Sequence, residues 1–299
     1  MLPIQLSKDS KNLKRDELLT LSTGPIIACD FYVERAERRQ PVVGGYESGR
    51  IVNIDHHADT QEMSRVVSSA NLALARVRTL GQPPADALVV ITHTDCDSIL
   101  SAGIMSGRLA AEDRYGNAAI AADHTGDENA IADLLQALDK ARDIELSFDA
   151  LARLEAGLPQ SEMVEEKLAE RRGKRLAAME NVRSGRVTMQ ANLAVGALED
   201  AIDGEFFAPL LPDAVIIMLA SPLTENTQRL EVKLRLGRAA PAGLSMHALG
   251  IRAFDPAYGG RWNAGSNKRE GGTSLALKEY AARLRALLDA WMNRGGGVT

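Results

Sequence analysis

Short apolar segments that each end at an aspartate are the feature that most constrains how this chain folds. They lie in the first 124 residues, and segments with helical spacing, such as Ser68–Leu80, separate them. Short strands that alternate with helices are typical of a doubly wound, parallel sheet. We therefore predict an α/β fold with a parallel-sheet N-terminal domain. The four segments are Pro25–Cys29 before Asp30, Ile51–Ile54 before Asp55, Ala87–Thr92 before His93–Asp97, and Ala118–Ala122 before Asp123.

The carboxyl ends of parallel strands share one edge of the sheet, and ligands bind at that edge. The aspartates that follow the four predicted strands should therefore lie together. The chain has only five histidines, and four of them lie close in sequence to these aspartates: His56, His57, His93 and His124. The sequence thus predicts one metal site assembled from several strand ends.

The predicted ligands favour particular ions. Carboxylates and water suit Mn²⁺ and Mg²⁺, and imidazole adds affinity for Mn, Fe, Co or Zn. A carboxylate that bridges two ions holds them about 3.5–4 Å apart, as in two-metal hydrolases. Asp59 or Asp127 would orient a histidine from behind it. Structural alternatives remain for single segments: the aspartates of His93–Asp97 can cap a helix, Asp123 can cap the helix that begins near Asn129, and Asp30 can be a loop acid.

The net charge, the cysteine count and the lengths of the apolar runs limit which ligands and which cellular location we expect. The net charge of −5 and the pI near 5.7 argue against a protein that coats long nucleic acid, but they allow a small phosphorylated ligand. Cys29 and Cys96 are the only cysteines, so we expect no disulfide framework and a reducing, cytoplasmic location. The N-terminus has no apolar stretch of the signal-peptide type, and no apolar run is long enough to cross a bilayer.

Beyond residue 128 the sequence no longer shows short apolar strands that end at aspartates. The densely charged segment Ser161–Ser184 predicts a solvated connecting helix, Arg229–Leu236 alternates with the period of a half-buried strand, and Leu275–Met292 predicts an amphipathic helix. We expect a catalytic domain over residues 1–140, a helical connector over 141–205, and a smaller α/β substrate-binding domain over 206–299.

A glycine-rich, basic segment lies in the last of these parts. Glycine lets backbone N–H groups approach an anion, and arginine binds phosphate bidentately. The alternative is a solvated loop with a basic tip. The candidate substrate-binding residues are Gly259, Gly260, Arg261, Asn263, Lys268 and Arg269.

Three motifs together resemble the DHH phosphoesterase superfamily. Ile54-Asp55-His56-His57 resembles its signature, His93–Ser98 resembles its first metal-binding motif, and Gly259–Gly265 resembles the glycine-rich loop of the associated DHHA1 domain. The resemblance covers most of residues 25–127 and 212–275. It implies a DHH-like domain and a DHHA1-like domain, with manganese-dependent hydrolysis of phosphorylated substrates.

The chain departs from the family in two ways. Its two metal-binding motifs occur in the reverse order, which a permuted sheet order would reconcile, and Arg261 stands where a histidine is usual. Carried over residue by residue, the resemblance makes Asp30 the bridging aspartate. His57 would contact phosphate, and Asp55 would orient its neighbours. The resemblance places His93 and Asp95 on one ion, and His56, Asp97 and Asp123 on the other.

The sequence therefore predicts a two-metal phosphoesterase in which a metal-bound hydroxide attacks phosphorus. Two Mn²⁺ ions are expected, with Mg²⁺ or Co²⁺ as alternatives. The substrate would be a short single-stranded oligonucleotide, a cyclic dinucleotide or a nucleotide phosphoester; no membrane partner is expected, and a homodimer is left open. The alternative from another class is a non-catalytic nucleotide- or phosphate-binding regulatory module.

Overall fold

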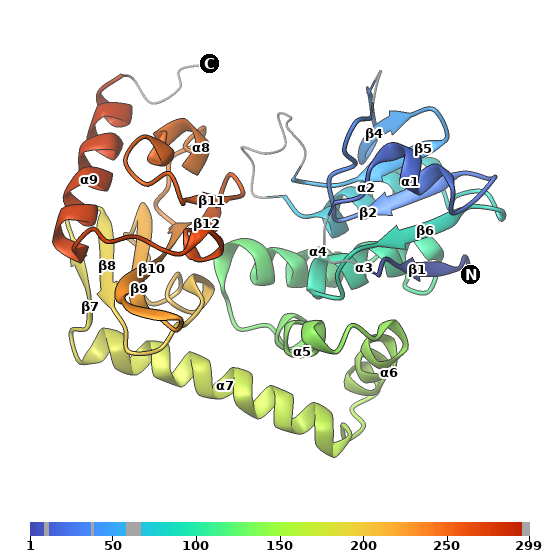
Figure 1. Ribbon diagram of the computed structural model, residues 1–299. Coiled ribbons are helices and arrows are strands. Elements are labelled where there is room, and N and C mark those ends of the chain that lie inside the picture. The colour runs from blue at the N-terminus through green and yellow to red at the C-terminus, as the bar shows by residue number, and fades with distance from the viewer. Residues whose placement is uncertain (9–11, 37–38, 58–66, 295–299) are drawn as a thin grey trace. The chain divides into compact units, whose positions relative to one another are not determined.

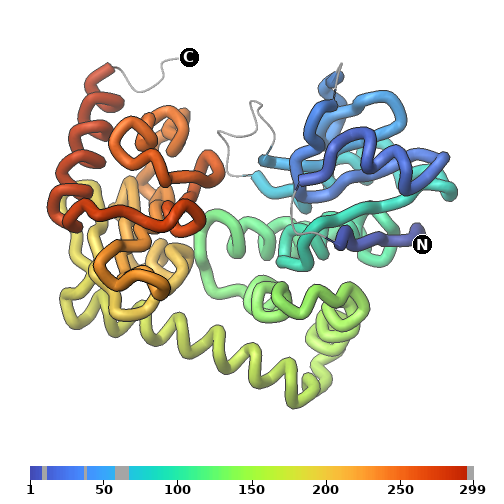
Figure 2. Tube along the Cα trace, viewed as in Figure 1, coloured from blue at the N-terminus to red at the C-terminus, as the bar shows by residue number. Residues whose placement is uncertain are grey.

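The computed structural model describes residues 1–8, 12–36, 39–57 and 67–294. The chain divides into two compact units (Figures 1 and 2). The first comprises Met1–Asp123 and Glu128–Arg171, and the second comprises His124–Asp127 and Arg172–Thr299. No helix in the described part of the chain combines the length and the apolar character needed to cross a bilayer.

The first unit contains a six-stranded mixed sheet with strand order β1-β6-β2-β5-β4-β3. Four neighbouring strands run parallel, and the last two form an antiparallel extension at one edge. The predicted parallel sheet is thus observed in the part that carries the aspartates. The strands are β1 (Ile4–Leu6), β2 (Ile26–Cys29), β3 (Gln40–Val42), β4 (Gly45–Ser48), β5 (Ile51–Ile54) and β6 (Leu88–Ile91).

The central strands are continuously apolar because helices cover both faces of the sheet. Side chains alternate between the faces, so that Ile27 and Cys29 enter one core and Ile26 and Ala28 enter the other. Helices α2 (Ser69–Leu80), α3 (Cys96–Ser106) and α4 (Asp113–Ile120) line the first core, and α1 (Arg15–Leu19) lines the second. The unit continues with α5 (Ala130–Leu138), a 3₁₀ turn η3 (Asp139–Ala141) and α6 (Ile144–Glu155).

The predicted strand Ala118–Ala122 is wrong. This segment is helical, since α4 runs to Ile120 and a π-helical turn, η2 (Ala121–Thr125), follows it. Alanine is the best helix former, and a short apolar run cannot be assigned to strand or helix by periodicity alone. Tyr115 and Ala118, three residues apart, both lie in the helix-lined core of the first unit. Asp123 therefore lies on a helical turn and not at a strand end.

The second unit contains its own six-stranded sheet, with strand order β11-β12-β10-β9-β8-β7. Among the described strands of this sheet, only β8 and β9 pair in parallel. Ile216 and Met218 enter the core that α9 (Leu277–Asn293) covers, and Ile217 and Leu219 enter the opposite core. The strands are β7 (Val187–Gln190), β8 (Leu193–Ala197), β9 (Ile216–Leu223), β10 (Asn226–Leu236), β11 (Gly259–Gly260) and β12 (Ala264–Ser266).

Helix α7 (Glu162–Arg183) forms where the charged connecting helix was predicted. Val164 packs into a small core of the first unit, and Ala178 packs into a core of the second. The second unit also contains η4 (Gly204–Phe206), α8 (Met246–Leu249), η5 (Ile251–Ala253) and η6 (Lys268–Glu270). Strands β7 and β8 fall within residues 141–205 and belong to the second sheet, and the division into catalytic domain, connector and substrate-binding domain stays a prediction.

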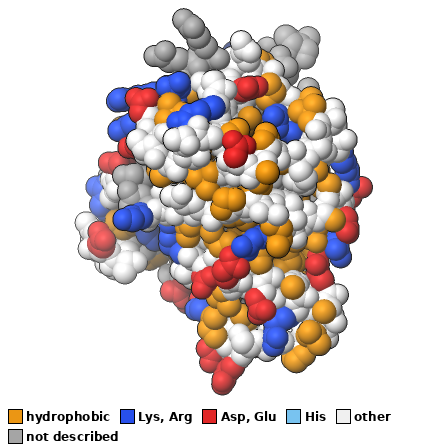
Figure 3. Space-filling model, turned by 90° about the vertical axis from the view of Figure 1, so that its right-hand side faces the viewer, with side chains coloured by type: hydrophobic (Ala, Val, Ile, Leu, Met, Phe, Trp, Pro, Cys, Tyr) orange, Lys and Arg blue, Asp and Glu red, His pale blue; other side chains and the backbone are white. Residues whose placement is uncertain are grey.

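Charged side chains of both signs lie on the face of the molecule that Figure 3 shows. In the view of Figure 3, basic and acidic side chains are interspersed over the face shown. This distribution agrees with the small net charge of −5.

Candidate metal centre

Most of the candidate ligands lie just after three adjacent parallel strands. Strands β6, β2 and β5 are neighbours in the sheet, and each ends immediately before a segment that bears aspartate. Asp30 follows β2, and Asp55 with His56 and His57 follows β5. The segment after β6 turns into α3, which has Asp97 in its first turn. Because the strands are parallel, these side chains emerge at the same edge of the sheet.

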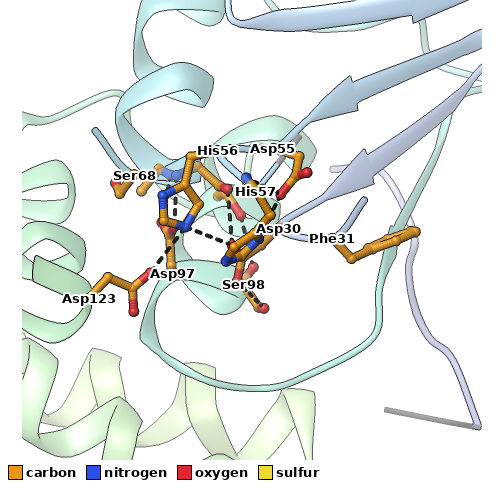
Figure 4. A network of polar contacts seen from close by, with 12 residues as sticks. Asp30, Phe31, Asp55, His56, His57, Ser68, Asp97, Ser98 and Asp123 are labelled. Carbon is orange, nitrogen blue, oxygen red and sulfur yellow. Dashed lines mark hydrogen bonds and ion pairs between the residues drawn. The ribbon is translucent and has the colours of Figure 1, made fainter. Parts of the chain in front are cut away.

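His56 lies at the centre of a cluster of carboxylates (Figure 4). Its Nε2 atom is 3.3 Å from Asp123, 3.5 Å from Asp97 and 3.7 Å from Asp30. One ligand atom from each of these four residues lies within 4.8 Å of the other three. Three of the four residues are almost completely buried, and the Asp123 side chain is 9% exposed. A small cation could contact all four at once.

Asp30 is held in an unusual backbone conformation. Its φ is +59°, in the left-handed region that costs an ordinary residue about 1–2 kcal/mol. The hydroxyl groups of Ser98 and Ser69 donate to its two carboxylate oxygens over 2.7 Å and 3.0 Å. Aspartate adopts this region more readily than most residues, so the conformation alone does not indicate function. The burial of the Asp30 carboxylate and its two serine partners favour a functional role over the loop acid considered above.

Asp97 is fixed by the beginning of helix α2. The backbone N–H groups of Ser69 and Ala70 donate to its two carboxylate oxygens, both over 2.7 Å. These bonds satisfy two of the N–H groups that a helix N-terminus leaves unpaired. Asp97 thus has a structural function as well as its place in the cluster. The serines that hold the carboxylates, Ser69 and Ser98, were not identified from the sequence, where they are ordinary helix-start residues.

His57 is oriented by Asp55. The Nδ1 atom of its ring is 2.8 Å from Oδ1 of Asp55, and its backbone N–H also donates to that oxygen, over 3.1 Å. Burial opposes ionisation of Asp55, but the charge and hydrogen bond of His57 outweigh it and lower the pKa of Asp55. An ionised carboxylate at Nδ1 keeps the proton on that atom and leaves Nε2 for other contacts. The His57 side chain is 14% exposed, so it lies nearer to solvent than His56.

The cluster accumulates negative charge in a buried place. Burial alone would lower the pKa of His56, but contact with Asp123 and the charges of Asp97 and Asp123 raise it to about 9. Burial, opposed by the charge of His56 and reinforced by Asp123, raises the pKa of Asp97 to about 7. Without a metal, the protonated imidazole is the cation that offsets the carboxylates.

The donor set fits a divalent cation. Three carboxylates and one imidazole suit Mn²⁺, and the same carboxylates with water suit Mg²⁺. Buried carboxylates need a compensating positive charge, and a divalent ion would supply more of it than the single proton on His56. The four residues that would hold this ion are Asp30, His56, Asp97 and Asp123.

Two predicted ligands do not join this group among the described residues. His93 and Asp95 are half-buried on the turn between β6 and α3, and neither belongs to the groups of candidate ligands within 4.8 Å of one another. The Nδ1 atom of His93 is 3.0 Å from the Thr92 hydroxyl, and Asp95 caps α3 by accepting from the N–H of Ser98 over 3.0 Å. Their assignment to a second ion stays a prediction.

The two residues expected to assist from behind the ligands, Asp127 and Asp59, are not seen to orient a histidine among the described residues. His124 and Asp127 belong to the second unit, where the His124 ring lies 5.9 Å from the ring of Trp262, centre to centre. Asp127 forms an ion pair with Arg238. Asp59, the other residue expected to orient a histidine, lies outside the described residues.

The glycine-rich segment forms a hairpin in the second unit. Strands β11 and β12 pair antiparallel, and the N–H of Arg261 donates to the carbonyl of Ala264 over 2.7 Å. Arg261 and Arg269 are exposed, whereas Asn263 is buried. Lys268 is exposed and lies 3.2 Å from Glu231. The segment therefore presents backbone and arginine side chains at a surface, as an anion-binding loop requires, and its role stays a prediction.

Comparisons with known proteins give structural matches only. No protein-family model matches the chain, and no curated protein matches it significantly. One similar solved structure is PggH, a pGpG-specific phosphodiesterase from Vibrio cholerae, with 13% identity and a TM-score of 0.44 over 71% of this chain and 81% of that one. Another is an exopolyphosphatase-related protein from Bacteroides fragilis, with 15% identity and a TM-score of 0.39 over 90% of this chain and 72% of that one.

Proposed function

We propose that this chain is a two-metal-dependent phosphoesterase of the DHH type that hydrolyses a small phosphorylated substrate. The observation that carries the proposal is the buried meeting of Asp30, His56, Asp97 and Asp123. A purely structural ion cluster would not require three carboxylates around a single imidazole, because their buried negative charge needs a further cation. Carboxylate-rich ligation also differs from the closed Cys/His sets of structural zinc sites.

The proposal assigns the metal ions to the following residues. Asp30, whose two oxygens are separately anchored, is suited to bridge two ions. His56, Asp97 and Asp123 would hold one ion together with Asp30, and His93 and Asp95 would hold the other. When bound, the ions supply an acidified water as nucleophile and neutralise charge on the phosphoryl group.

His57 and Asp55 form a pair suited to act on the substrate. The Asp55 carboxylate fixes the ring of His57, and the ring retains some exposure. A histidine held in this way can bind a phosphoryl oxygen or transfer a proton. In the second unit, Gly259, Gly260, Arg261, Asn263, Lys268 and Arg269 would bind the distal phosphate or nucleotide.

The substrate class follows from charge and from the proposed family. An acidic chain is unsuited to long nucleic acid, so we infer a short oligonucleotide, a cyclic dinucleotide or a nucleotide phosphoester. The alternative is a regulatory module that binds such a ligand without hydrolysing it.

Hydrolysis of a generic phosphodiester, bis(p-nitrophenyl) phosphate, tests the proposal. Metal-depleted protein should be inactive, and Mn²⁺ should restore turnover that excess chelator removes. Asp123→Asn should abolish turnover while the chain stays folded. Asp97 is a poorer probe, because its removal leaves two buried N–H groups of α2 without their acceptor.

Asp143→Asn provides a matched control. Asp143 caps α6 and belongs to no group of candidate ligands among the described residues, and asparagine caps helices equally well. Full activity is expected in this variant. Mn²⁺-loaded protein that hydrolyses no phosphoester would refute the enzyme, and nucleotide binding under those conditions would support the regulatory module.

A further inference from the structure

One of the four clustered candidate ligands is joined directly to a segment that belongs to the second unit. Asp123 ends its stretch of the first unit, and the residues that follow it, His124–Asp127, belong to the second. Asp123 and Thr125 lie in the same π-helical turn, η2. Single π-helical turns are rare and often occur at functional sites. The position of the Asp123 carboxylate therefore depends on how the end of η2 is held.

The end of η2 is held by Arg238, which follows β10 in the second unit. The Nε and Nη2 atoms of Arg238 donate to the carbonyl oxygen of Thr125 over 3.3 Å and 3.0 Å. The Nη2 atom also donates to the carboxylate of Asp127, with which Arg238 forms an ion pair. Arginine can make these contacts together because its N–H groups form a rigid fork. One guanidinium group thus fixes both the last carbonyl of the turn and the side chain two residues beyond it.

The residue between these two contacts is held as well. The guanidinium of Arg175, on α7, donates to the carbonyl of Gly126 over 3.1 Å. Gly126 has φ +68°, and a methyl group at this position would overlap the backbone carbonyl of Glu205. Glycine accepts both the left-handed backbone and the close approach. Three successive residues of the segment that follows Asp123 are therefore bound by partners in the second unit.

We infer that Arg238 is a positioning residue for the candidate metal centre. By holding the end of η2, it keeps the Asp123 carboxylate beside His56 and sets the affinity of the four-residue cluster for a divalent cation. Groups of the first unit hold the carboxylates of Asp30 and Asp97, so loss of Arg238 weakens the ion without removing these ligands. The inference rests on the proposed metal-dependent function, but it needs only the ion of this cluster.

Binding of Mn²⁺ to metal-depleted protein, measured by equilibrium dialysis, tests the inference. Arg238→Ala removes the contacts with η2, and Asp123→Asn identifies the ion that depends on Asp123. Arg78→Ala provides a matched control, because Arg78 makes the same kinds of contact at the opposite end of α4 from η2. The guanidinium of Arg78 donates twice to the carbonyl of Ala111 and forms an ion pair with Asp113.

We expect Arg238→Ala to raise the Mn²⁺ dissociation constant by about 10–100-fold, as loss of a residue that orients a ligand commonly does, and Arg78→Ala to leave it unchanged. Gly126→Ala displaces the same segment through its backbone and should weaken Mn²⁺ binding as well. In the Asp123→Asn background, Arg238→Ala should weaken the remaining Mn²⁺ binding no further, because the ligand through which it acts is already lost. Thermal melts in chelator show that each variant is folded.

Wild-type Mn²⁺ affinity in Arg238→Ala would overturn the inference. Equal losses of affinity in Arg238→Ala and Arg78→Ala would also overturn it, because they would reflect a general loss of stability. A further loss in the Asp123→Asn background would do the same, since Arg238 would then act by another route. A wild type that binds no Mn²⁺ would overturn the proposed function itself, and the inference with it.

Discussion

Replacement of Asp30 by asparagine should reveal whether the cluster is built for a metal or for stability. At an effective dielectric constant of 20, two carboxylates within 4.8 Å of each other, as in the cluster, repel each other by at least about 3.5 kcal/mol. Burial raises the pKa of Asp97 to about 7, so Asp97 carries less than a full charge near neutral pH. The repulsion on Asp30 from Asp123 and Asp97 together therefore exceeds about 3.5 kcal/mol.

The attraction between His56 and Asp30 opposes this repulsion. Protonated His56, 3.7 Å away, attracts Asp30 by about 4.5 kcal/mol. Asparagine removes both contributions and keeps its bonds to Ser69 and Ser98, because a hydroxyl can donate or accept. Asparagine also tolerates a left-handed backbone. We expect metal-free Asp30→Asn to be no more than about 1 kcal/mol less stable than the wild type.

Mn²⁺ should stabilise the wild type but not Asp30→Asn. At a free concentration 100 times the dissociation constant, binding stabilises the wild type by about 2.7 kcal/mol. For a unit of this size the melting temperature rises by about 5–10 °C. The melting temperature of Asp30→Asn should rise much less with Mn²⁺, because the proposed bridging ligand has lost its charge.

Calorimetry at pH 7, in chelator and in Mn²⁺, measures both effects, with Asp143→Asn expected to match the wild type throughout. If Asp30→Asn lost more than about 3 kcal/mol in chelator, Asp30 would be a structural hydrogen-bond acceptor and the charge balance would be wrong. A wild-type melting temperature that Mn²⁺ does not change would remove the ion from the cluster.

Three further predictions follow from the site. The pKa of His56 in the folded chain is about 9, above its ordinary value of 6.5. Protonation of His56 therefore stabilises the metal-free folded chain. The full stabilisation is present below about pH 6.5 and is lost as the pH rises through about 9. Urea titrations in chelator should show a loss of as much as about 3 kcal/mol over that range, and His56→Gln should lack it. Asp55→Asn should lower kcat by about 10²–10⁴-fold with bound metal retained, because it releases the ring of His57, and an unchanged kcat would exclude that pair from the chemistry. Arg261→Ala should raise KM with little change in kcat, and an unchanged KM would exclude the glycine-rich hairpin from substrate binding.

Much of the sheet could be predicted because burial on both faces leaves a local signal. Ile26–Cys29, Ile51–Ile54 and Leu88–Ile91 are continuous apolar runs, and all three are strands. The edge strands β3 and β4 lack such runs, because they are less buried, and were not predicted. The alanine-rich segment before Asp123 was assigned wrongly because a short apolar run cannot be assigned to strand or helix by periodicity alone.

The sequence by itself identified the candidate ligands, because each aspartate follows an apolar run whose end is a local property of the chain. Only the tertiary structure decided which of them meet. The order β6-β2-β5 brings Asp30, Asp97 and His56 to one edge, and a helical turn from another part of the chain delivers Asp123. The order of strands depends on packing between segments far apart in sequence, which leaves no trace in any one of them. The same packing supplies the hydroxyls of Ser69 and Ser98, whose part in the site is visible only once their helices are in place.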